Sequence, residues 1–237
     1  MHMSKGEDTR HAVLDQATRT ASQVGLRGVT IGTLAEQTQM SKSGLFAHFG
    51  SKESLQLATM RHARQRFIDL VLRPALALPR GEPRVRALVD GWLRWDDVMP
   101  GGCLFVAAGV EFDDSPGPQR DEVARIQREF SETIARIFRS GITAGHFRED
   151  ADPEQFAFVA KGLLLSYHHH RRLLGDPSAE QRTRRAFDAL LDAARPPPGP
   201  STGPHPSPSG HRPDLDDLLN RPDPDDLLTR PDPDDLS

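Results

Sequence analysis

The sequence predicts an all-α fold, and three observations support this prediction. Apolar residues recur every three or four positions in almost every segment before Pro196, as they do in helices with one buried face. No segment alternates apolar and polar residues in the way that is typical of a half-buried strand. The hydrophobic fraction of 36% is low, but the shortfall lies mainly in the proline-rich stretch after Arg195. The chain before that stretch has the composition of an ordinary soluble protein.

Four helices are expected before Pro74, separated by turn and capping residues. The second begins after Thr30, a residue that favours helix N-caps, and the third runs to about Phe49. The fourth begins after Ser51 and should end near Leu72, because proline is disfavoured inside a helix. The other residues that define these helices are, in chain order, Val13, Leu14, Ala17, Ala21, Val24, Gly25 and Gly28, then Ile31, Leu34 and Ala35, then Leu45 and Gly50.

Longer helices are expected in the second half of the chain. A fifth helix ends near Pro100, and a short apolar helix follows over residues 103–112. The segment DDSPGP leads to a long helix that Gly145 ends. Another helix begins with Asp152 as its N-cap and Pro153 in its first position. The apolar positions are Leu88, Val89, Trp92 and Leu93, then Val123, Ile126, Phe130, Ile134, Ile137 and Ile142, then Phe156, Val159, Ala160, Leu163, Leu164 and Tyr167, and, in a last helix, Phe187, Leu190 and Leu191.

The chain changes character after Arg195. The segment PPPGPSTGPHPSPSGH is expected to be an extended, flexible linker. A nine-residue repeat follows, RPDLDDLLN, RPDPDDLLT and RPDPDDLS, and its prolines and aspartates predict disorder. We therefore expect three parts: a small helical domain over residues 1–55, a larger helical domain over 56–195 and a disordered, acidic tail over 196–237.

Charge and cysteine content narrow the class of protein. The repeat carries nine aspartates and three arginines, a net charge of −6, which leaves +2 on the rest of the chain from a total of −4. Only the local placement of charge can then indicate a nucleic-acid partner. The single cysteine, Cys103, excludes an internal disulfide framework and suits a reducing cytoplasm. No apolar run approaches the length of a membrane span, so no membrane partner is expected.

The stretch from Thr30 to Leu55 predicts a DNA-binding surface. Two short helices joined by a tight turn can place the second helix in a major groove, which is wide enough for one helix. The residues outside the helix pair are mostly small or polar, and helix N-termini attract phosphate. A polar helical hairpin without a DNA role is the alternative. The candidate DNA-binding residues are Thr30, Ser41, Lys42, Ser43, Gly44, Phe46, His48 and Lys52.

This stretch resembles the N-terminal signature of the TetR family of regulators. The resemblance implies a helix-turn-helix DNA-binding domain over 1–55, which includes the start of a connecting helix, and an effector-binding and dimerisation domain over 56–195. It also implies a homodimer that represses transcription from a palindromic operator and responds to a small-molecule effector. The family usually has tyrosine where Phe46 stands, and Phe46 lacks the hydroxyl that commonly touches a phosphate. The matching residues are Thr9, Arg10, Val13, Leu14, Ala17, Gly25, Thr30, Ile31, Leu34, Ala35 and residues 41–49 and 51–55, with a weaker cue at residues 101–104.

Aromatic residues of the larger domain are candidates for the wall of an effector cavity, because ligand sites often lie between helices. Plain core packing is the alternative for each of them. Cys103 follows two glycines at a predicted helix N-terminus, which would lower its pKa and favour redox sensing. A small, buried and unreactive cysteine is the alternative. The candidate effector residues are Trp92, Trp95, Cys103, Phe105, Phe112, Phe130 and Tyr167.

No cofactor, metal or catalytic group is expected. His168, His169 and His170 are adjacent, and successive side chains on a helix point about 100° apart, so the three cannot share one ion. No nucleophile and base occur in a pattern typical of catalysis, so we expect a regulator rather than an enzyme.

Two functions remain open at this point. In the first, an effector changes the separation of the two recognition helices in a dimeric cytoplasmic repressor. In the second, the acidic leucine-rich tail recruits a protein partner, and the protein activates transcription or acts as a tether. A tail that only adds solubility, or that competes with DNA for the basic face, is also compatible with the sequence.

Overall fold

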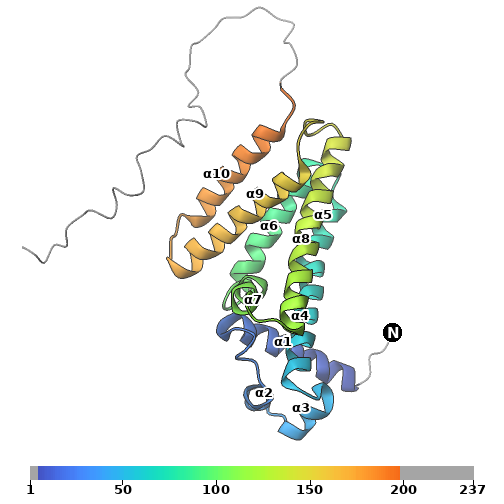
Figure 1. The fold of residues 1–237 in the computed structure, drawn as a ribbon, viewed down its shortest axis with the longest axis vertical. Helices are drawn as coiled ribbons and strands as arrows, with labels where there is room; N and C mark the ends of the chain where they lie inside the picture. The colour runs from blue at the N-terminus through green and yellow to red at the C-terminus, as the bar shows by residue number, and fades with distance from the viewer. Residues whose placement is uncertain (1–4, 198–237) are drawn as a thin grey trace, which may run out of the picture. The chain divides into compact units, whose positions relative to one another are not determined.

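A computed structural model describes residues 5–197, and all the regular structure in this part is helical (Figure 1). The all-α prediction is therefore confirmed there, and no helix of this part is long and apolar enough to cross a membrane. Most of the predicted tail, residues 198–237, lies outside the described residues. The helices are α1 (Lys5–Val24), α2 (Ile31–Thr38), α3 (Lys42–Phe49), α4 (Lys52–Phe67), α5 (Arg73–Ala77), α6 (Glu82–Val98), α7 (Leu104–Phe112), α8 (Pro118–Thr143), α9 (Pro153–His168) and α10 (Ala179–Ala194), with π-helical turns η1 (Ile68–Leu72) and η2 (His169–Leu173).

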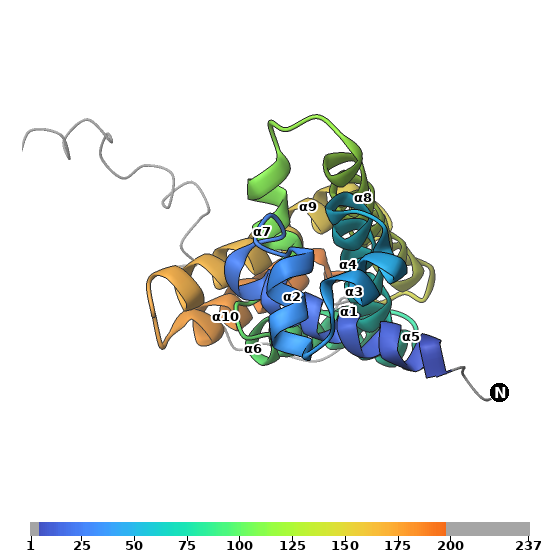
Figure 2. The same ribbon diagram turned by 90° about the horizontal axis from the view of Figure 1, so that it is seen from below.

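Helices α1 to α3 form a small N-terminal module, which Figure 2 shows with α2 and α3 nearest the viewer. Leu34 and Leu45 are buried where α2 and α3 meet. The hydroxyls of Thr30, Ser41 and Ser51 each accept a hydrogen bond from the backbone N–H three residues further on, at 3.1, 3.0 and 3.0 Å. Such caps satisfy an amide that has no partner within the helix. The predicted starts of α2 and α4, and the predicted end of α3 at Phe49, are confirmed.

The prediction that the fourth helix ends at Leu72 is wrong. After α4 the backbone makes the π turn η1 and continues through Pro74 as α5. In a regular helix the proline ring would collide with the carbonyl four residues back. The π turn is wider, because the N–H of Arg73 bonds to Ile68 O, five residues back. The wider turn accommodates Pro74, and α4, η1 and α5 form one long element.

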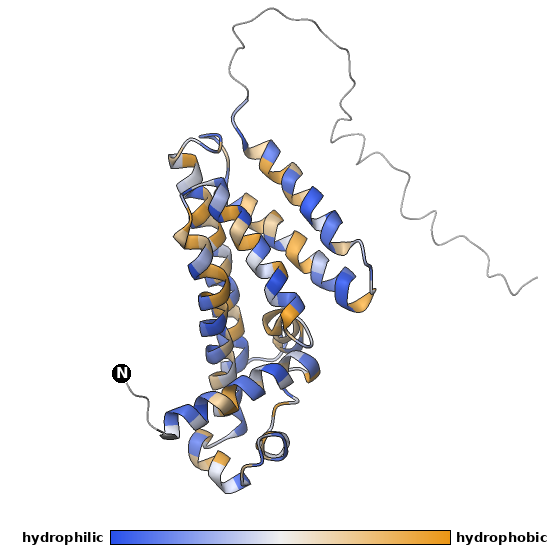
Figure 3. Cartoon of the chain, turned by 180° about the vertical axis from the view of Figure 1, so that it is seen from behind, coloured by the Kyte–Doolittle hydropathy of each residue, from blue (hydrophilic) through white to orange (hydrophobic). Residues whose placement is uncertain are grey.

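The body, α4 to α10, packs around an apolar core, and apolar residues lie mostly on the faces that its helices turn toward one another (Figure 3). Phe138 of α8 stacks on Phe147 and Phe156, with ring centroids 4.4 and 3.9 Å away. Phe156 of α9 meets Phe187 of α10 edge-on, at 6.4 Å. Aromatic pairs in these geometries contribute beyond their buried area, and this cluster joins three helices.

A buried carboxylate fastens the end of α6 to the end of α9. Asp96 is fully buried and accepts hydrogen bonds from the N–H of Cys103 and from the ring of His168, both at 2.7 Å. Arg172 of η2 lies 3.6 Å from the same carboxylate and donates to backbone carbonyls of the turn after α6. A buried charge requires such partners, because it has lost its hydration.

Replacing Asp96 with alanine should lower the free energy of unfolding by about 3 kcal/mol, because His168 and Arg172 would lose their buried partner. Urea unfolding followed by circular dichroism measures this change. The exposed aspartate Asp114 is the matched control, and Asp114→Ala should change the free energy by less than about 0.5 kcal/mol. Equal effects of the two substitutions would contradict the anchoring role of Asp96.

Candidate nucleic-acid interface and ligand cavity

Helix α3 presents most of the predicted DNA-binding residues to solvent. Lys42, Ser43 and Phe46 are exposed, and Phe46 is exposed to 58%. Gly44 and His48 are partly exposed. Phe46 thus adds one exposed apolar side chain to a helix face whose other exposed residues are small or polar.

The remaining predicted DNA-binding residues lie at helix starts. Thr30 and Ser41 use their hydroxyls as N-caps of α2 and α3. Lys52 is exposed and is the first residue of α4. Ser43 Oγ lies 3.2 Å from Ser41 Oγ, so the hydroxyl of Ser43 is tied to the cap. The surface thus combines three helix N-termini, which carry partial positive charge, with two lysines.

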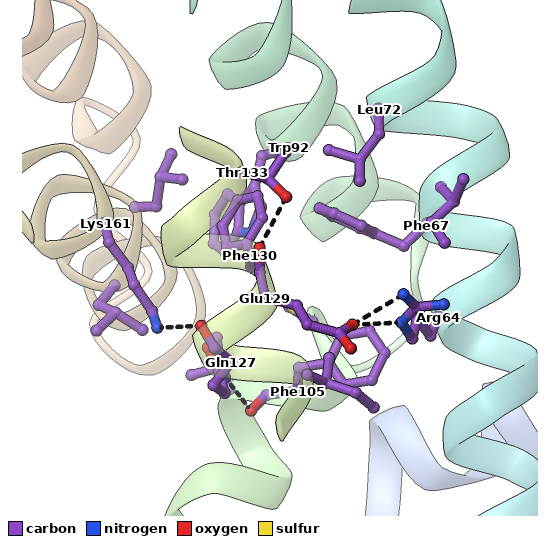
Figure 4. A pocket seen from close by; sticks show the side chains of 16 residues that line it. Arg64, Phe67, Leu72, Trp92, Phe105, Gln127, Glu129, Phe130, Thr133 and Lys161 are labelled. Carbon is purple, nitrogen blue, oxygen red and sulfur yellow. Dashed lines mark hydrogen bonds and ion pairs between the residues drawn. The ribbon is translucent and has the colours of Figure 1, made fainter. Parts of the chain in front are cut away.

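A cavity lies in the body between α4, α6, α7, α8 and α9 (Figure 4). It encloses about 660 Å³ of empty space, part of which is open to solvent. The predicted effector residues Trp92, Cys103, Phe105 and Phe130 line this cavity. The other lining residues are Arg64, Phe67, Ile68, Leu72, Val106, Ile126, Gln127, Glu129, Thr133, Lys161, Leu164 and Leu165.

Three predicted effector residues do not line this cavity. Trp95 is buried behind it and packs edge-on against Phe67, with ring centroids 5.6 Å apart. Phe112 packs under the guanidinium of Arg27, 4.9 Å from the ring centroid. Tyr167 is buried, and its hydroxyl donates to a carboxylate of α6 at 3.0 Å. These residues have the packing roles that the sequence left open.

Sequence reasoning missed the charged residues of the cavity wall. Arg64 of α4 pairs with Glu129 of α8, with Arg64 Nε 2.8 Å from Glu129 Oε2. Lys161 of α9 donates to Gln127 O at 3.2 Å and to Ser131 Oγ at 3.1 Å, and burial lowers its pKa below the ordinary value. The sequence does contain a feature that could have identified Lys161 as unusual, because it is the one charged residue in the apolar run FVAKGLLL.

The expected lowering of the Cys103 pKa is wrong. Cys103 is the N-cap residue of α7, as the sequence indicated, but its side chain is only 3% exposed. Burial disfavours the charged thiolate and raises the pKa of Cys103 to about 11, and hydrogen bonds from the helix start do not offset this. Cys103 is a buried, neutral thiol.

The three consecutive histidines have separate surroundings. His168 bonds to Asp96, His169 is exposed, and His170 lies 3.7 Å from Asp176. Within residues 5–197, no group of three or more histidine, cysteine, aspartate or glutamate side chains is placed to hold a metal ion.

A joint connects the body to the N-terminal module. Glu111, near the end of α7, accepts hydrogen bonds from the backbone N–H groups of Leu26 and Arg27, both at 2.7 Å. These amides belong to the turn between α1 and α2. Nearby, the N–H of Gly101 donates to Ser22 Oγ at 3.2 Å. Bonds to a carboxylate are stronger than bonds between neutral groups, so Glu111 makes a strong contact between α7 and the α1–α2 turn.

Two glycines allow the close approach at the joint. Gly25 has a φ of +75°, and a Cβ added there would lie 3.0 Å from the carboxylate of Glu111. A Cβ added at Gly101 would lie 1.7 Å from Ser22 O, so only glycine fits between the α6–α7 turn and the last turn of α1. The joint was not visible in the sequence, because its partners are far apart along the chain.

Two family models match this chain. Residues 13–59, from α1 into α4, match the model described as bacterial regulatory proteins, tetR family. Residues 81–187, from α6 into α10, match the model described as tetracyclin repressor-like, C-terminal domain.

Relatives and solved structures agree with these matches. The HTH-type transcriptional regulator BetI of Cronobacter sakazakii is 30% identical over 157 residues, which are 65% of this chain and 73% of the relative. Two other curated relatives match over shorter stretches, and the chain spans 43% and 36% of their lengths. A TetR transcriptional regulator from Chloroflexus aurantiacus is 25% identical, with a TM-score of 0.68 over 80% of this chain and 96% of that chain. AibR, solved with isovaleryl coenzyme A and operator DNA, is 22% identical, with a TM-score of 0.61 over 80% of this chain and 99% of that chain.

The fold, the exposed α3 surface and the cavity define a helix-turn-helix protein with a helical body that contains a cavity. The chain belongs to the TetR family of transcription regulators. The matching families are families of regulators and not of enzymes.

Cys103 should react with iodoacetamide about a hundredfold more slowly in the folded protein than in guanidinium-unfolded protein at pH 8. A pKa of about 11 leaves about one thiolate per thousand molecules at that pH. Mass spectrometry of timed samples gives both rates without ambiguity, since the chain has one cysteine. Similar rates in the two states would show that the thiol is accessible and ionised.

Proposed function

We propose that this protein is a ligand-responsive repressor that binds a palindromic operator in double-stranded DNA as a homodimer in the cytoplasm. The main support for this proposal is the joint between the body and the N-terminal module, because one helix, α7, contacts both the cavity and that module. Helix α7 lines the cavity with Phe105 and holds the N-terminal module through Glu111. A ligand that binds better to one position of α7 would therefore favour one position of α3.

On the DNA side, we assign α3 to the major groove. Lys42 and Ser43 at its start would meet phosphates and base edges, and Gly44 would allow the backbone to come close. Phe46 would pack against a thymine methyl or a sugar, since it has no hydroxyl to donate. Lys52 would contact phosphate from the start of α4. His48 lies further along α3, and Thr30 and Ser41 would contribute through the helix N-termini that they cap.

We assign the homodimer interface to α9 and α10. Phe156 and Phe187 face the core of their own subunit, so other residues of these helices must form the interface. The outward face of α9 carries Phe158, which is 76% exposed. Two such helix pairs make a four-helix interface, and small residues allow close packing. The outward residues in helical register are Phe158, Gly162 and Leu165 on α9 and Ala186, Ala189 and Ala193 on α10.

The geometry of the dimer explains how a ligand would release the protein from operator DNA. Two recognition helices must meet major grooves about 34 Å apart on the same side of the DNA. A ligand that changes this separation lowers the affinity, because both half-sites can no longer be met together. AibR, a protein of the same fold, has been solved with both operator DNA and a small ligand, which supports the combination of the two functions.

Selection of DNA from a random pool by the purified protein tests the proposal and supplies an operator. Lys52→Ala should then weaken binding to every sequence and flatten the salt dependence by about one in log–log slope, because one phosphate contact is lost. Fluorescence anisotropy at several salt concentrations measures the slope. Lys52→Arg keeps the charge and should bind like the original protein. An unchanged slope for Lys52→Ala would remove Lys52 from the interface, and failure to enrich any sequence would contradict operator binding.

Phe158→Glu should convert a dimer into a monomer at micromolar concentration, because a charge would be buried at the centre of the proposed interface. Light scattering coupled to size exclusion gives the mass. Val110 of α7 is exposed to 75%, almost as much as Phe158, and Val110→Glu is the matched control. If both variants remain dimeric, or if the original protein is a monomer, the interface is assigned wrongly.

A further inference from the structure

The charges on the cavity wall do not balance. Three charged side chains line the cavity: Arg64, Glu129 and Lys161. Glu129 is fully engaged, since one of its oxygens accepts from Arg64 at 2.8 Å and the other accepts from Arg125. Lys161 has no carboxylate partner in the described part of the chain, and its ammonium group donates only to a backbone carbonyl and a hydroxyl. The wall therefore carries one positive charge that no protein anion offsets.

Lys161 is also poorly hydrated. Its side chain is half-buried, and burial lowers its pKa with no opposing contribution from a nearby negative charge. Keeping an unpaired ammonium group in such a place costs free energy, which an anion would recover. Its bonds to Gln127 O and Ser131 Oγ, at 3.2 and 3.1 Å, lie at the long end of the usual range. These bonds hold the ammonium at the wall.

The rest of the cavity suits an apolar molecule. Phe67 lies at the centre of the aromatic wall, with Phe130 and Phe105 edge-on at 5.3 and 6.5 Å. Figure 4 shows Lys161 on one side of the cavity, beyond Phe130, and the Arg64–Glu129 pair on the opposite side, between Phe67 and Phe105. An occupant would therefore have apolar contacts along its body and a single cation at one end.

We propose that the cavity binds a small monocarboxylate with an aliphatic or aromatic body, and that Lys161 receives the carboxylate. One ammonium group matches one negative charge, whereas a phosphate would need more donors than this wall offers. A cationic ligand would meet the unpaired charge of Lys161 and find Glu129 already neutralised. The proposal deepens the proposed function by naming the class of effector. It rests on that function only for the expectation that ligand binding releases operator DNA.

The two tryptophans provide a direct readout that needs no DNA. Trp92 lines the cavity and Trp95 packs behind it, and the chain has no other tryptophan. Tryptophan fluorescence is titrated with straight-chain alkanoates of four to twelve carbons, with phenylalkanoates, and with the amides of the same skeletons. The best carboxylate should bind about tenfold or more tightly than its amide, as expected for a hydrogen bond between charged groups.

Two variants isolate the charge of Lys161. Lys161→Met keeps the length and adds no polar group, and Lys161→Gln retains a donor for Gln127 O. Each should bind the carboxylate and its amide with affinities equal to within about threefold. Arg128→Met removes an exposed positive charge from α8, away from the cavity wall, and should leave the preference unchanged. Circular dichroism verifies that each variant is folded.

The outcomes separate the two proposals. If every carboxylate fails to bind at concentrations up to about 10 mM, if the amides or the matching alkylammonium ions bind as well, or if both Lys161 variants keep the preference, the carboxylate proposal is overturned. If the carboxylates bind as predicted but do not release selected operator DNA in anisotropy measurements, the ligand class stands and the ligand-responsive function fails.

Discussion

A carboxylate of the body, Glu111, holds the turn at which the N-terminal module meets α7. Glu111 accepts from two successive backbone amides in the turn that directs α2, and charged acceptors of this kind make strong, short bonds. On the other side, α4 begins beside α3 and continues into the cavity wall through Arg64 and Phe67. Arg66 of α4 also lies 2.6 Å from Asp15 of α1. Helices α4 and α7 both line the cavity and both contact the module, so a change of cavity shape would reach the α3 surface through either helix.

Within the body, Gln127 connects the ligand cavity to this joint. Its side chain donates to Phe105 O at 2.9 Å, and its backbone carbonyl accepts from Lys161. The contacts thus run without a break from α9 through α8 to α7, and from α7 to the α1–α2 turn. Asp96 of α6 fixes the start of α7, because its buried carboxylate accepts a hydrogen bond from the N–H of Cys103. Helix α7 is shorter than α4, α6, α8 and α9, and together with α4 it links the cavity to the N-terminal module.

Local chemistry explains what the sequence could predict. A hydroxyl such as that of Thr30 or Ser51 caps a helix through bonds three residues away, so the helix starts were readable. The continuation past Pro74 was not, because it runs through the π turn η1, which periodicity does not predict and in which Val71 packs close to Gly91 of α6. Periodicity placed Trp92 on an apolar helix face, and Trp95 was a candidate only as an aromatic residue. Neither kind of evidence can separate a cavity wall from the core behind it. The predicted lowering of the Cys103 pKa was wrong for the same reason. The position of Cys103 at a helix start can be read from the local sequence, whereas the burial that raises its pKa comes from tertiary packing. The roles of Lys161 and Glu111 could not be predicted from the sequence, because their hydrogen-bond partners lie far away along the chain.

The contacts of Glu111 with the N-terminal module are to main-chain amides, and none of the exposed residues of α3 takes part in the joint. The α3 side chains that we propose to face DNA could therefore change without altering how the module is held. On the function proposed above, operator preference and ligand response would be separable traits. A chimaera that carries a foreign α3 surface on this body would then respond to the same ligand at a different operator.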